Sequence, residues 1–540
     1  MVNALEKEAL LNVQAAKGRE KPRKVVIITD PGRDHDDEQA FTILRGLEKC
    51  GLVEVQAVIT NLSPPETVGD QRARLARGAF KSLQFAHLPP VAIGSNDNPE
   101  YKPEDHEFAA TYLASPEDVE PDGQALLKKT FLEAADAGDT LDLILISGMQ
   151  DARDFIQENL PLAKQVIGKV TIMGGVQVTG DTIKLDDNDC MIPDTAYNNI
   201  VDKPRGEEAR KAGLSPTDAG PAAKDLYEIL QKGGFEMQIV TRHAASAAAV
   251  PPAFYDDLAE TGHEVALRLK RDQKASIQRR WEEYMNNPIV ERLNRMWFAS
   301  QFTHNPATKM VEMHFDLHNV WKYVTRLSLY DGLAVMKDIL PESISEQLFE
   351  PTIQEVAGRT HQIVGVSAEK HGIRDVAKVH TMLSALAHFG LSKEQEIEQL
   401  PVQERQPVPV DGHALALEIE EDMEKQKGYL PAFMQYYVEN GAIIISKVKG
   451  LKHLLEEARR WTSIGGYSPE TYIFETNPEI FDNRDKITLL QALEHLFGIR
   501  AIPGKINQQD FTLTITTDDP HVKMYIETMI LPKERERGGP

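Results

Sequence analysis

The chain has 540 residues, a formal net charge of −23 and only two cysteines. This length exceeds one ordinary hydrophobic core, so two or more domains are expected. The negative charge excludes a sequence-wide binder of nucleic acid or anionic membranes, because phosphate groups would repel it, and two cysteines exclude a disulfide framework or a thiolate zinc site.

Residues 1–23 are predicted to be an N-terminal extension, in which a short amphipathic helix precedes a basic tether. No apolar core follows an N-terminal charge, as a secretory signal would require. No segment approaches the roughly 20 apolar residues of a membrane span. We therefore expect a cytoplasmic protein that binds no membrane and takes small molecules or metal cations as ligands.

Residues 24–371 alternate between strand and helix patterns and are predicted to form the main domain. Apolar runs rich in β-branched residues indicate buried strands, and helical spacing follows most of them. This alternation predicts right-handed βαβ units, and therefore an α/β fold with a mostly parallel sheet flanked by helices. The predicted strands lie at residues 24–30, 53–60, 88–95, 141–147, 165–175 and 235–241.

The remaining segments have a different character. A charged, helix-rich insertion is predicted at about residues 253–320, and the alternation in residues 352–368 predicts a β-hairpin. Residues 372–540 are predicted to be a mainly α-helical C-terminal domain with one strand at 511–517. The sequence assigns no role to this last region.

An acidic cluster follows the first predicted strand, in the stretch "VVIITDPGRDHDDEQAF" at residues 25–41. Carboxylates this close repel one another unless a cation or shared protons neutralise them. In open parallel sheets ligands bind at the carboxyl ends of the strands, which is where these carboxylates lie. The pattern therefore predicts a bound cation, with carboxylates that merely favour a helix N-terminus as the alternative.

The N-terminal half resembles the nucleoside hydrolases, the superfamily that includes the inosine–uridine-preferring enzymes. That family opens with a strand ending in D-x-D-P-G-x-D-D. Here Asp30-Pro31-Gly32 and then Asp36-Asp37 follow the strand, Ile28 replaces the leading Asp, and three residues separate Gly32 from the Asp pair instead of one. Four further segments resemble family motifs in the family's order: "LISGMQDARDF", "TIMGGVQ", "MQIVTRHAASAAAVPP" and "LYDGLAVMKDILP".

This resemblance implies a Ca²⁺ ion held by Asp30, Asp37, Asp331 and the backbone carbonyl of Ile146. Calcium suits such a set because it prefers oxygen ligands and tolerates irregular geometry. A bound metal lowers the pKa of a nucleophilic water, and Asp30 would take the proton of that water as general base.

Other positions are implied as contacts to the sugar and to the leaving base. Asp36, Asn61, Asp186 and Asn188 correspond to ribose contacts. Many family members have a His immediately before the last metal-binding Asp, where Tyr330 stands here, so Tyr330 is a candidate acid although an ordinary Tyr pKa near 10 makes it a weak one. His35, in the acidic loop, and His106, in the flap-like segment "NPEYKPEDHEF", are the substitute candidates.

The resemblance implies Ca²⁺-dependent hydrolysis of the N-glycosidic bond of a ribonucleoside or related N-riboside, in a dimer or tetramer of identical subunits. A second hypothesis is a catalytically inactive hydrolase-like scaffold whose C-terminal region binds a protein partner. A third is a metal phosphohydrolase of the HD type, suggested by His35-Asp36-Asp37. That type needs its His-Asp pair within a helix, whereas this pair follows a strand.

Overall fold

The computed structural model divides the chain into two compact units, Met1–Arg280 with Val324–Arg405, and Trp281–Tyr323 with Gln406–Pro540. We describe residues 2–400 except 20, 34, 63–67, 96–106, 205–210, 212–214, 216, 287–297, 299–300 and 304–319, and, beyond residue 400, five strands.

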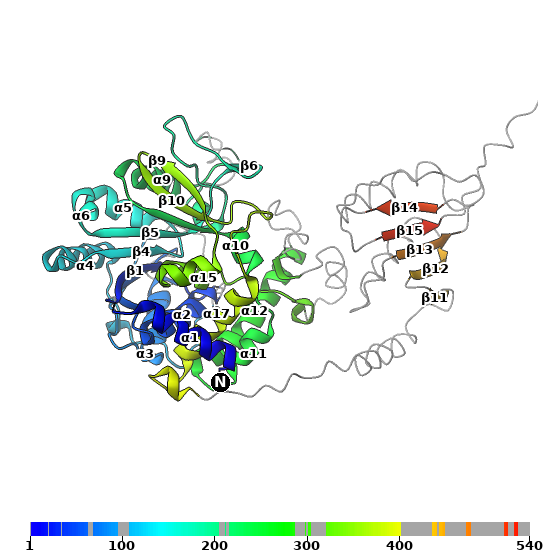
Figure 1. The fold of residues 1–540 in the computed structure, drawn as a ribbon, viewed down its shortest axis with the longest axis horizontal. Coiled ribbons are helices and arrows are strands. Elements are labelled where there is room, and N and C mark those ends of the chain that lie inside the picture. Colours follow the sequence, from blue (N-terminus) through cyan, green and yellow to red (C-terminus); the bar gives the residue numbers. More distant parts are fainter. Residues whose placement is uncertain are drawn as a thin grey trace, which may run out of the picture. The chain divides into compact units, whose positions relative to one another are not determined.

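The first unit is built on an eight-stranded sheet (Figure 1) with the order β3-β2-β1-β4-β5-β8-β10-β9. All neighbouring strands pair in parallel except β9 and β10, which form an antiparallel hairpin at one edge. The chain therefore has the predicted α/β fold with a mostly parallel sheet. The strands are β1 (Arg23–Thr29), β2 (Val53–Thr60), β3 (Val91–Ile93), β4 (Leu141–Leu145), β5 (Ile167–Gly174), β8 (Met237–Thr241), β9 (Thr352–Val356) and β10 (Arg359–Val364).

The central strands are buried on both faces, which explains their continuous apolar sequences. The last five residues of β1 and all of β4 and β8 are buried, as expected for strands covered by helices on both sides. All six strands predicted before residue 242 are confirmed. The hairpin is also confirmed, and its turn uses Ala357 and Gly358, both with positive φ angles of 49° and 75°, as the right-handed twist of paired strands requires.

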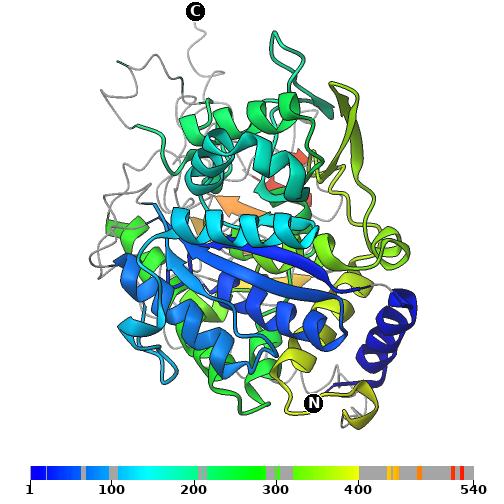
Figure 2. The ribbon, with the colours of Figure 1, turned by 90° about the vertical axis from the view of Figure 1, so that its left-hand side faces the viewer.

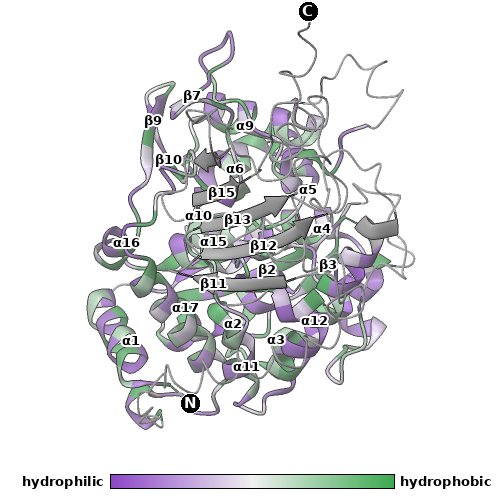
Figure 3. Ribbon diagram, turned by 90° about the vertical axis from the view of Figure 1, so that its right-hand side faces the viewer, coloured by the Kyte–Doolittle hydropathy of each residue, from purple (hydrophilic) through white to green (hydrophobic). Residues whose placement is uncertain are grey.

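Helices cover both faces of this sheet (Figure 2). One face carries α2 (Asp36–Lys49), α3 (Asp70–Ser82), α15 (Tyr330–Ile339) and α17 (Val376–Leu391), which pack on one another and on the strands. The other face carries α4 (Gly123–Ala137), α5 (Gln150–Glu158), α6 (Leu160–Val166), α7 (Tyr197–Ile200) and α9 (Pro221–Gly233). These helices carry both hydrophobic and hydrophilic residues (Figure 3), as amphipathic helices on a sheet do.

Helix α2 is the central helix of its face, because eleven of its residues are buried. It crosses α17 closely at two glycines: a Cβ at Gly46 would lie 2.1 Å from the carbonyl oxygen of Leu386, and one at Gly390 would lie 1.9 Å from that of Thr42. Helix α17 therefore packs directly on α2, although it follows the predicted domain boundary at residue 371.

The other helices connect or flank this core. They are α1 (Ala4–Lys17), which packs on α17, and α10 (Arg242–Ala247), α11 (Ala253–Ala259), α12 (Glu264–Asn286) and α16 (Glu342–Leu348). A short hairpin is formed by β6 (Val178–Thr179) and β7 (Thr182–Ile183). Among the described residues, no helix combines the length and hydrophobicity needed to cross a bilayer.

The second unit contains a five-stranded sheet in the order β11-β12-β13-β15-β14. Strand β14 coincides with the single strand predicted in this region. The two segments predicted to be helical here, residues 414–428 and 450–461, lie outside the described residues, and that prediction stays a prediction. The strands are β11 (Gln435–Glu439), β12 (Ala442–Val448), β13 (Thr471–Thr476), β14 (Thr512–Thr516) and β15 (Lys523–Glu527).

Candidate functional site

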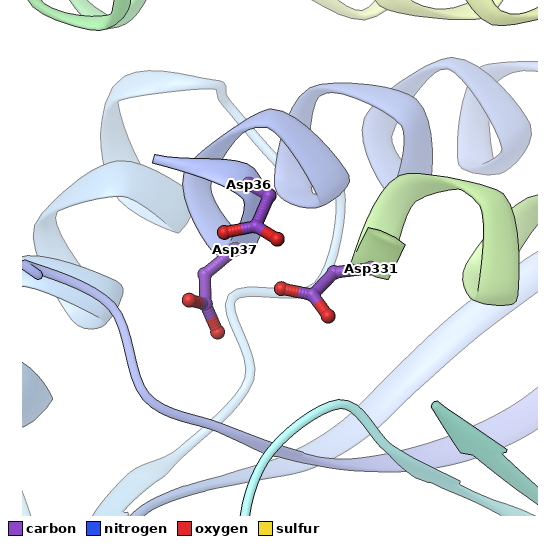
Figure 4. Close-up of side chains that lie close together, drawn as sticks. All are labelled: Asp36, Asp37 and Asp331. Carbon is purple, nitrogen blue, oxygen red and sulfur yellow. The ribbon is translucent and has the colours of Figure 1, made fainter. Parts of the chain in front are cut away.

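Three carboxylates converge at the carboxyl edge of the sheet (Figure 4): Asp36 and Asp37 in the first turn of α2, and Asp331 in the first turn of α15. One oxygen of each lies within 4.8 Å of the others. Asp37 is only 1% exposed and Asp331 4%. The fold thus joins two helix N-termini that are almost three hundred residues apart in the sequence.

The Asp37 side chain is oriented by the end of β1. Its Oδ1 atom accepts a hydrogen bond of 2.8 Å from the backbone N–H of Asp30 and another from the hydroxyl of Thr29. Hydrogen bonds to an ionised carboxylate stabilise its charged form. Asp37 therefore links the strand end to the helix start, and it is held in one orientation within the cluster.

Asp30 is buried next to this cluster and contacts a basic residue. Its Oδ2 atom lies 3.4 Å from Nη1 of Arg72, a fully buried residue of α3. The same Arg72 nitrogen donates a hydrogen bond of 2.9 Å to the carbonyl of Pro31. Arg72 therefore fixes the turn after β1. The three grouped carboxylates are those of Asp36, Asp37 and Asp331, whereas the sequence assigned Asp36 to the sugar and Asp30 to the metal.

Ile146, the predicted carbonyl ligand, follows β4 at the same edge of the sheet. It is 1% exposed, and its N–H donates a hydrogen bond of 2.9 Å to the carbonyl of Ile28. Because β4 is the parallel neighbour of β1, the residue that follows β4 lies beside the end of β1. Its role as a ligand remains a prediction.

Asn61 is placed at the end of β2, where its amide group is used within the protein. Its Nδ2 atom donates to Asp151 (2.9 Å) and to the carbonyl of Gly148 (3.1 Å), and its Oδ1 atom accepts from Ser147 (2.5 Å). Burial raises the pKa of Asp151, although hydrogen bonds from Ser95 and Asn61 oppose this. Asn61 therefore connects the end of β2 with the segment that follows β4, and its predicted contact with a sugar stays a prediction.

Asp186 and Asn188 lie in a turn beyond the β6–β7 hairpin. The Asp186 Oδ1 atom accepts the backbone N–H groups of Asn188 (2.8 Å) and Cys190 (2.9 Å). Burial raises the pKa of Asp186, but these two backbone hydrogen bonds outweigh it and lower the pKa. Asn188 is exposed. The structure therefore uses Asp186 to form its own turn and does not group it with the three carboxylates.

The three residues considered as acids for the leaving base lie in different parts of the chain. Tyr330 begins α15 beside Asp331, and burial raises its pKa, which weakens it further as an acid. His35 immediately precedes α2 and is fully buried, with Nε2 3.8 Å from Oδ2 of Asp272 in α12. His106 lies outside the described residues.

Two features of the site carry no obvious signal in the sequence. Arg33, in the acidic loop, donates a hydrogen bond of 3.1 Å from Nη1 to the hydroxyl of Tyr197 at the start of α7, and the Tyr197 side chain is partly exposed. In addition, Asp272 and Ser276 of α12 contact the acidic loop at His35 and Arg33. These contacts join segments that are far apart in sequence and have no recognisable motif.

The donor chemistry of the three-carboxylate cluster fits a hard divalent cation. All three side chains offer oxygen, which Ca²⁺ and Mg²⁺ prefer, and no sulfur or imidazole is grouped with them among the described residues. The N-termini of α2 and α15 also favour negative charge. Helix dipoles alone do not neutralise three adjacent carboxylates, because each N-terminus carries only about half a positive charge.

Comparison with known proteins gives the following matches. No protein-family model matches the sequence, and no curated protein matches it. The solved structure of the type III effector protein XopQ complexed with adenosine diphosphate ribose is 29% identical, with a TM-score of 0.58, over 72% of this chain and 99% of XopQ. The effector protein XOO4466 is also 29% identical, with a TM-score of 0.58, over 73% of this chain and 100% of its own.

The inosine-uridine preferring nucleoside hydrolase from Bacillus anthracis matches at 11% identity and a TM-score of 0.38, over 68% of this chain and 99% of the enzyme. The chain therefore shares the fold of the two effector proteins, and its sequence motifs resemble those of the nucleoside hydrolases.

Proposed function

We propose that the cluster of Asp36, Asp37 and Asp331 binds a divalent cation, with Ca²⁺ as the expected ion, and that the protein hydrolyses an N-riboside there. The observation that carries this proposal is the convergence of three carboxylates, two of them almost fully buried, from two helix N-termini. Carboxylates this close repel one another, and a divalent cation bound between them lowers that repulsion. A cation between them explains why the fold brings them together.

The side chains divide the chemistry of N-glycosidic cleavage between them. A bound divalent cation would supply polarisation of a nucleophilic water. Asp30 accepts the proton of that water as general base, and Arg72, 3.4 Å away, keeps its carboxylate at the end of β1. The carboxylates of the cluster provide negative charge, which favours the positively charged sugar of the oxocarbenium-like transition state.

Departure of the base is the step with the weakest support from this chain. Tyr330 precedes Asp331 and has a raised pKa because it is buried, so we expect it to assist the leaving group by hydrogen bonding more than by full proton transfer. Tyr330→Phe should then slow the release of purines more than that of activated leaving groups. Equal slowing of both substrates would exclude this role.

The direct test is a panel of ribosides (inosine, uridine and a chromogenic riboside) assayed with purified full-length protein, with Ca²⁺ and with chelator. We expect turnover that requires Ca²⁺ and that Asp37→Ala abolishes together with thermal stabilisation by Ca²⁺. Asp256→Asn serves as the control, because Asp256 pairs with Lys270 on the surface. Full turnover in Asp37→Ala would show that the site is wrong.

A second candidate function is binding of a ribose-containing nucleotide without turnover. It is favoured by the XopQ structure, which contains adenosine diphosphate ribose and matches this chain at 29% identity. It also agrees with the replacement of the family's His by Tyr330 and the enlarged acidic loop. Saturable binding of adenosine diphosphate ribose by calorimetry, with no release of any base from the panel, would favour this function over hydrolysis.

A further inference from the structure

One face of helix α12 contacts the enlarged acidic loop and the first turn of α2. Arg268, Asp272 and Ser276 are spaced four residues apart, which places them on the same side of the helix. Arg268 contacts Glu38, Asp272 lies 3.8 Å from Nε2 of His35, and Ser276 Oγ donates a hydrogen bond of 3.0 Å to the backbone carbonyl of Arg33. We call these three residues the α12 stripe.

Arg268 makes the most extensive contacts of the stripe. Its Nε and Nη2 atoms donate to the two carboxylate oxygens of Glu38 at 3.0 and 3.2 Å, and Nη1 donates to Asp272. The side chains of Arg268 and Glu38 are 2% and 0% exposed. The Tyr112 hydroxyl donates a further hydrogen bond of 2.6 Å to Glu38. A bidentate, fully buried pair of this kind fixes both side chains in one geometry.

Arg268 also contacts the segment at Glu107, which is hydrogen-bonded to the turn at Gly32. Arg268 Nη2 donates to the backbone carbonyl of Glu107, and the N–H of Glu107 donates a hydrogen bond of 2.7 Å to the carbonyl of Gly32. Gly32 has a φ of 106°, and a Cβ there would lie 2.3 Å from the Phe108 ring. The turn before the enlarged loop is thus fixed through contacts that meet at Arg268.

The position of these contacts matters because the acidic loop is long. Three residues separate Gly32 from Asp36, and each added residue gives a free loop more conformations. Asp36 and Asp37 follow directly, so movement of the loop and of the first turn of α2 would move two of the three carboxylates. Glu38 lies in that same turn.

We propose that Arg268 is a positioning residue for the cation site, and that the α12 stripe holds the enlarged loop so that Asp36 and Asp37 face Asp331. This inference rests on the proposed function, because it assigns the role through the cation that the cluster binds. It assigns a structural role at the cation site to α12, which belongs to the helical insertion predicted at about residues 253–320.

The test compares wild type, Arg268→Met and Arg268→Lys, with Lys270→Met as a matched control on the same helix, since Lys270 is exposed and pairs with Asp256. Calcium affinity is measured by calorimetry on chelator-treated protein. We expect Arg268→Met to weaken Ca²⁺ binding about 10- to 100-fold, as losing a residue that orients metal ligands does. Arg268→Lys should recover part of the affinity, and Lys270→Met should bind as wild type does.

Hydrogen exchange of the peptide spanning residues 29–41, measured without metal, reports loop order independently of cation binding. Exchange in this peptide should rise in Arg268→Met and stay unchanged in Lys270→Met. If wild type binds no Ca²⁺, the proposed function fails and this role fails with it. If wild type binds Ca²⁺ but Arg268→Met has the same affinity and exchange, the positioning role alone is wrong.

A double variant, Arg268→Met with Glu38→Gln, separates positioning from general stability. Arg268→Met alone leaves the buried Glu38 without its cationic partner, which is strongly destabilising, whereas neutralising both partners of a buried pair is far less so. Asp272, the other carboxylate partner of Arg268, keeps its pair with Arg271 in both variants. We expect the double variant to recover thermal stability relative to Arg268→Met but to keep the weakened Ca²⁺ affinity. Recovery of affinity together with stability would overturn the inference.

Discussion

Replacing Asp331 by Asn should stabilise the protein in chelator and abolish its response to Ca²⁺. Oxygens of Asp37 and Asp331 lie within 4.8 Å of each other, and both side chains are buried. At an effective dielectric constant of about 20, two unit charges at this distance repel by about 3.5 kcal/mol. Asn has the same shape as Asp without the charge. The free energy of unfolding of the Asp331→Asn variant in chelator should therefore exceed that of wild type, by at most a few kcal/mol.

Added Ca²⁺ should change the relative stability of the two proteins in favour of wild type. A cation that binds only the folded state stabilises it by about 2.7 kcal/mol at a concentration 100 times the dissociation constant. Wild type should gain this stability, and Asp331→Asn should gain none. The assay is thermal unfolding with chelator and with a Ca²⁺ series, with Asp256→Asn as the charge-matched control. The reasoning is refuted if Asp331→Asn is less stable than wild type in chelator and still responds to Ca²⁺.

Three further predictions concern the packing around the site. Lys49→Met should lower the free energy of unfolding by about 2–3 kcal/mol in urea titrations. The reason is that Lys49 Nζ donates to three backbone carbonyls in and just after the last turn of α17, at 2.7, 2.7 and 2.9 Å. An unchanged unfolding midpoint would show that these hydrogen bonds do not stabilise the protein. Gly46→Ala should cost about 1–3 kcal/mol in the same assay, since its Cβ would lie 2.1 Å from the Leu386 carbonyl oxygen; wild-type stability would show that α2 and α17 are not so close. Burial holds the pKa of Lys337 at about 8 instead of 10.5, so the unfolded state binds more protons between these values and stability should rise with pH from about 8 to 10.5. Thermal unfolding should show a smaller rise in Lys337→Met, and an identical rise would contradict the assignment.

The sheet was predictable because the signal for each strand is local. Buried parallel strands need apolar residues on both faces, so segments such as residues 24–30 and 141–147 show continuous apolar runs. The packing of α17 on α2 was less accessible, since it depends on Gly46 and Gly390, and a glycine within a helix does not show which helix it will meet. The predicted boundary at residue 371 reflects a change in composition, which does not report tertiary contacts.

The motifs named both Asp37 and Asp331, which the fold brings together at two helix N-termini; their role as metal ligands stays a prediction. Contacts between side chains of distant segments were not predictable. The sequence resemblance implies Asp30 as a metal ligand and general base, and only the fold shows that Arg72 of α3 lies 3.4 Å away. Likewise Arg268 and Asp272 have the i, i+4 spacing that is usually an exposed pair on a charged helix, but here both side chains are buried against the loop.

The central claim is that Asp36, Asp37 and Asp331 hold one divalent cation between them. Crystals grown or soaked with Mn²⁺, with anomalous diffraction recorded at the manganese edge, test this directly, because Mn²⁺ accepts the same oxygen ligands. The account predicts one strong anomalous peak bounded by these three carboxylates. No peak there in crystals equilibrated with the metal, or a peak that leaves these side chains uncoordinated, would contradict it.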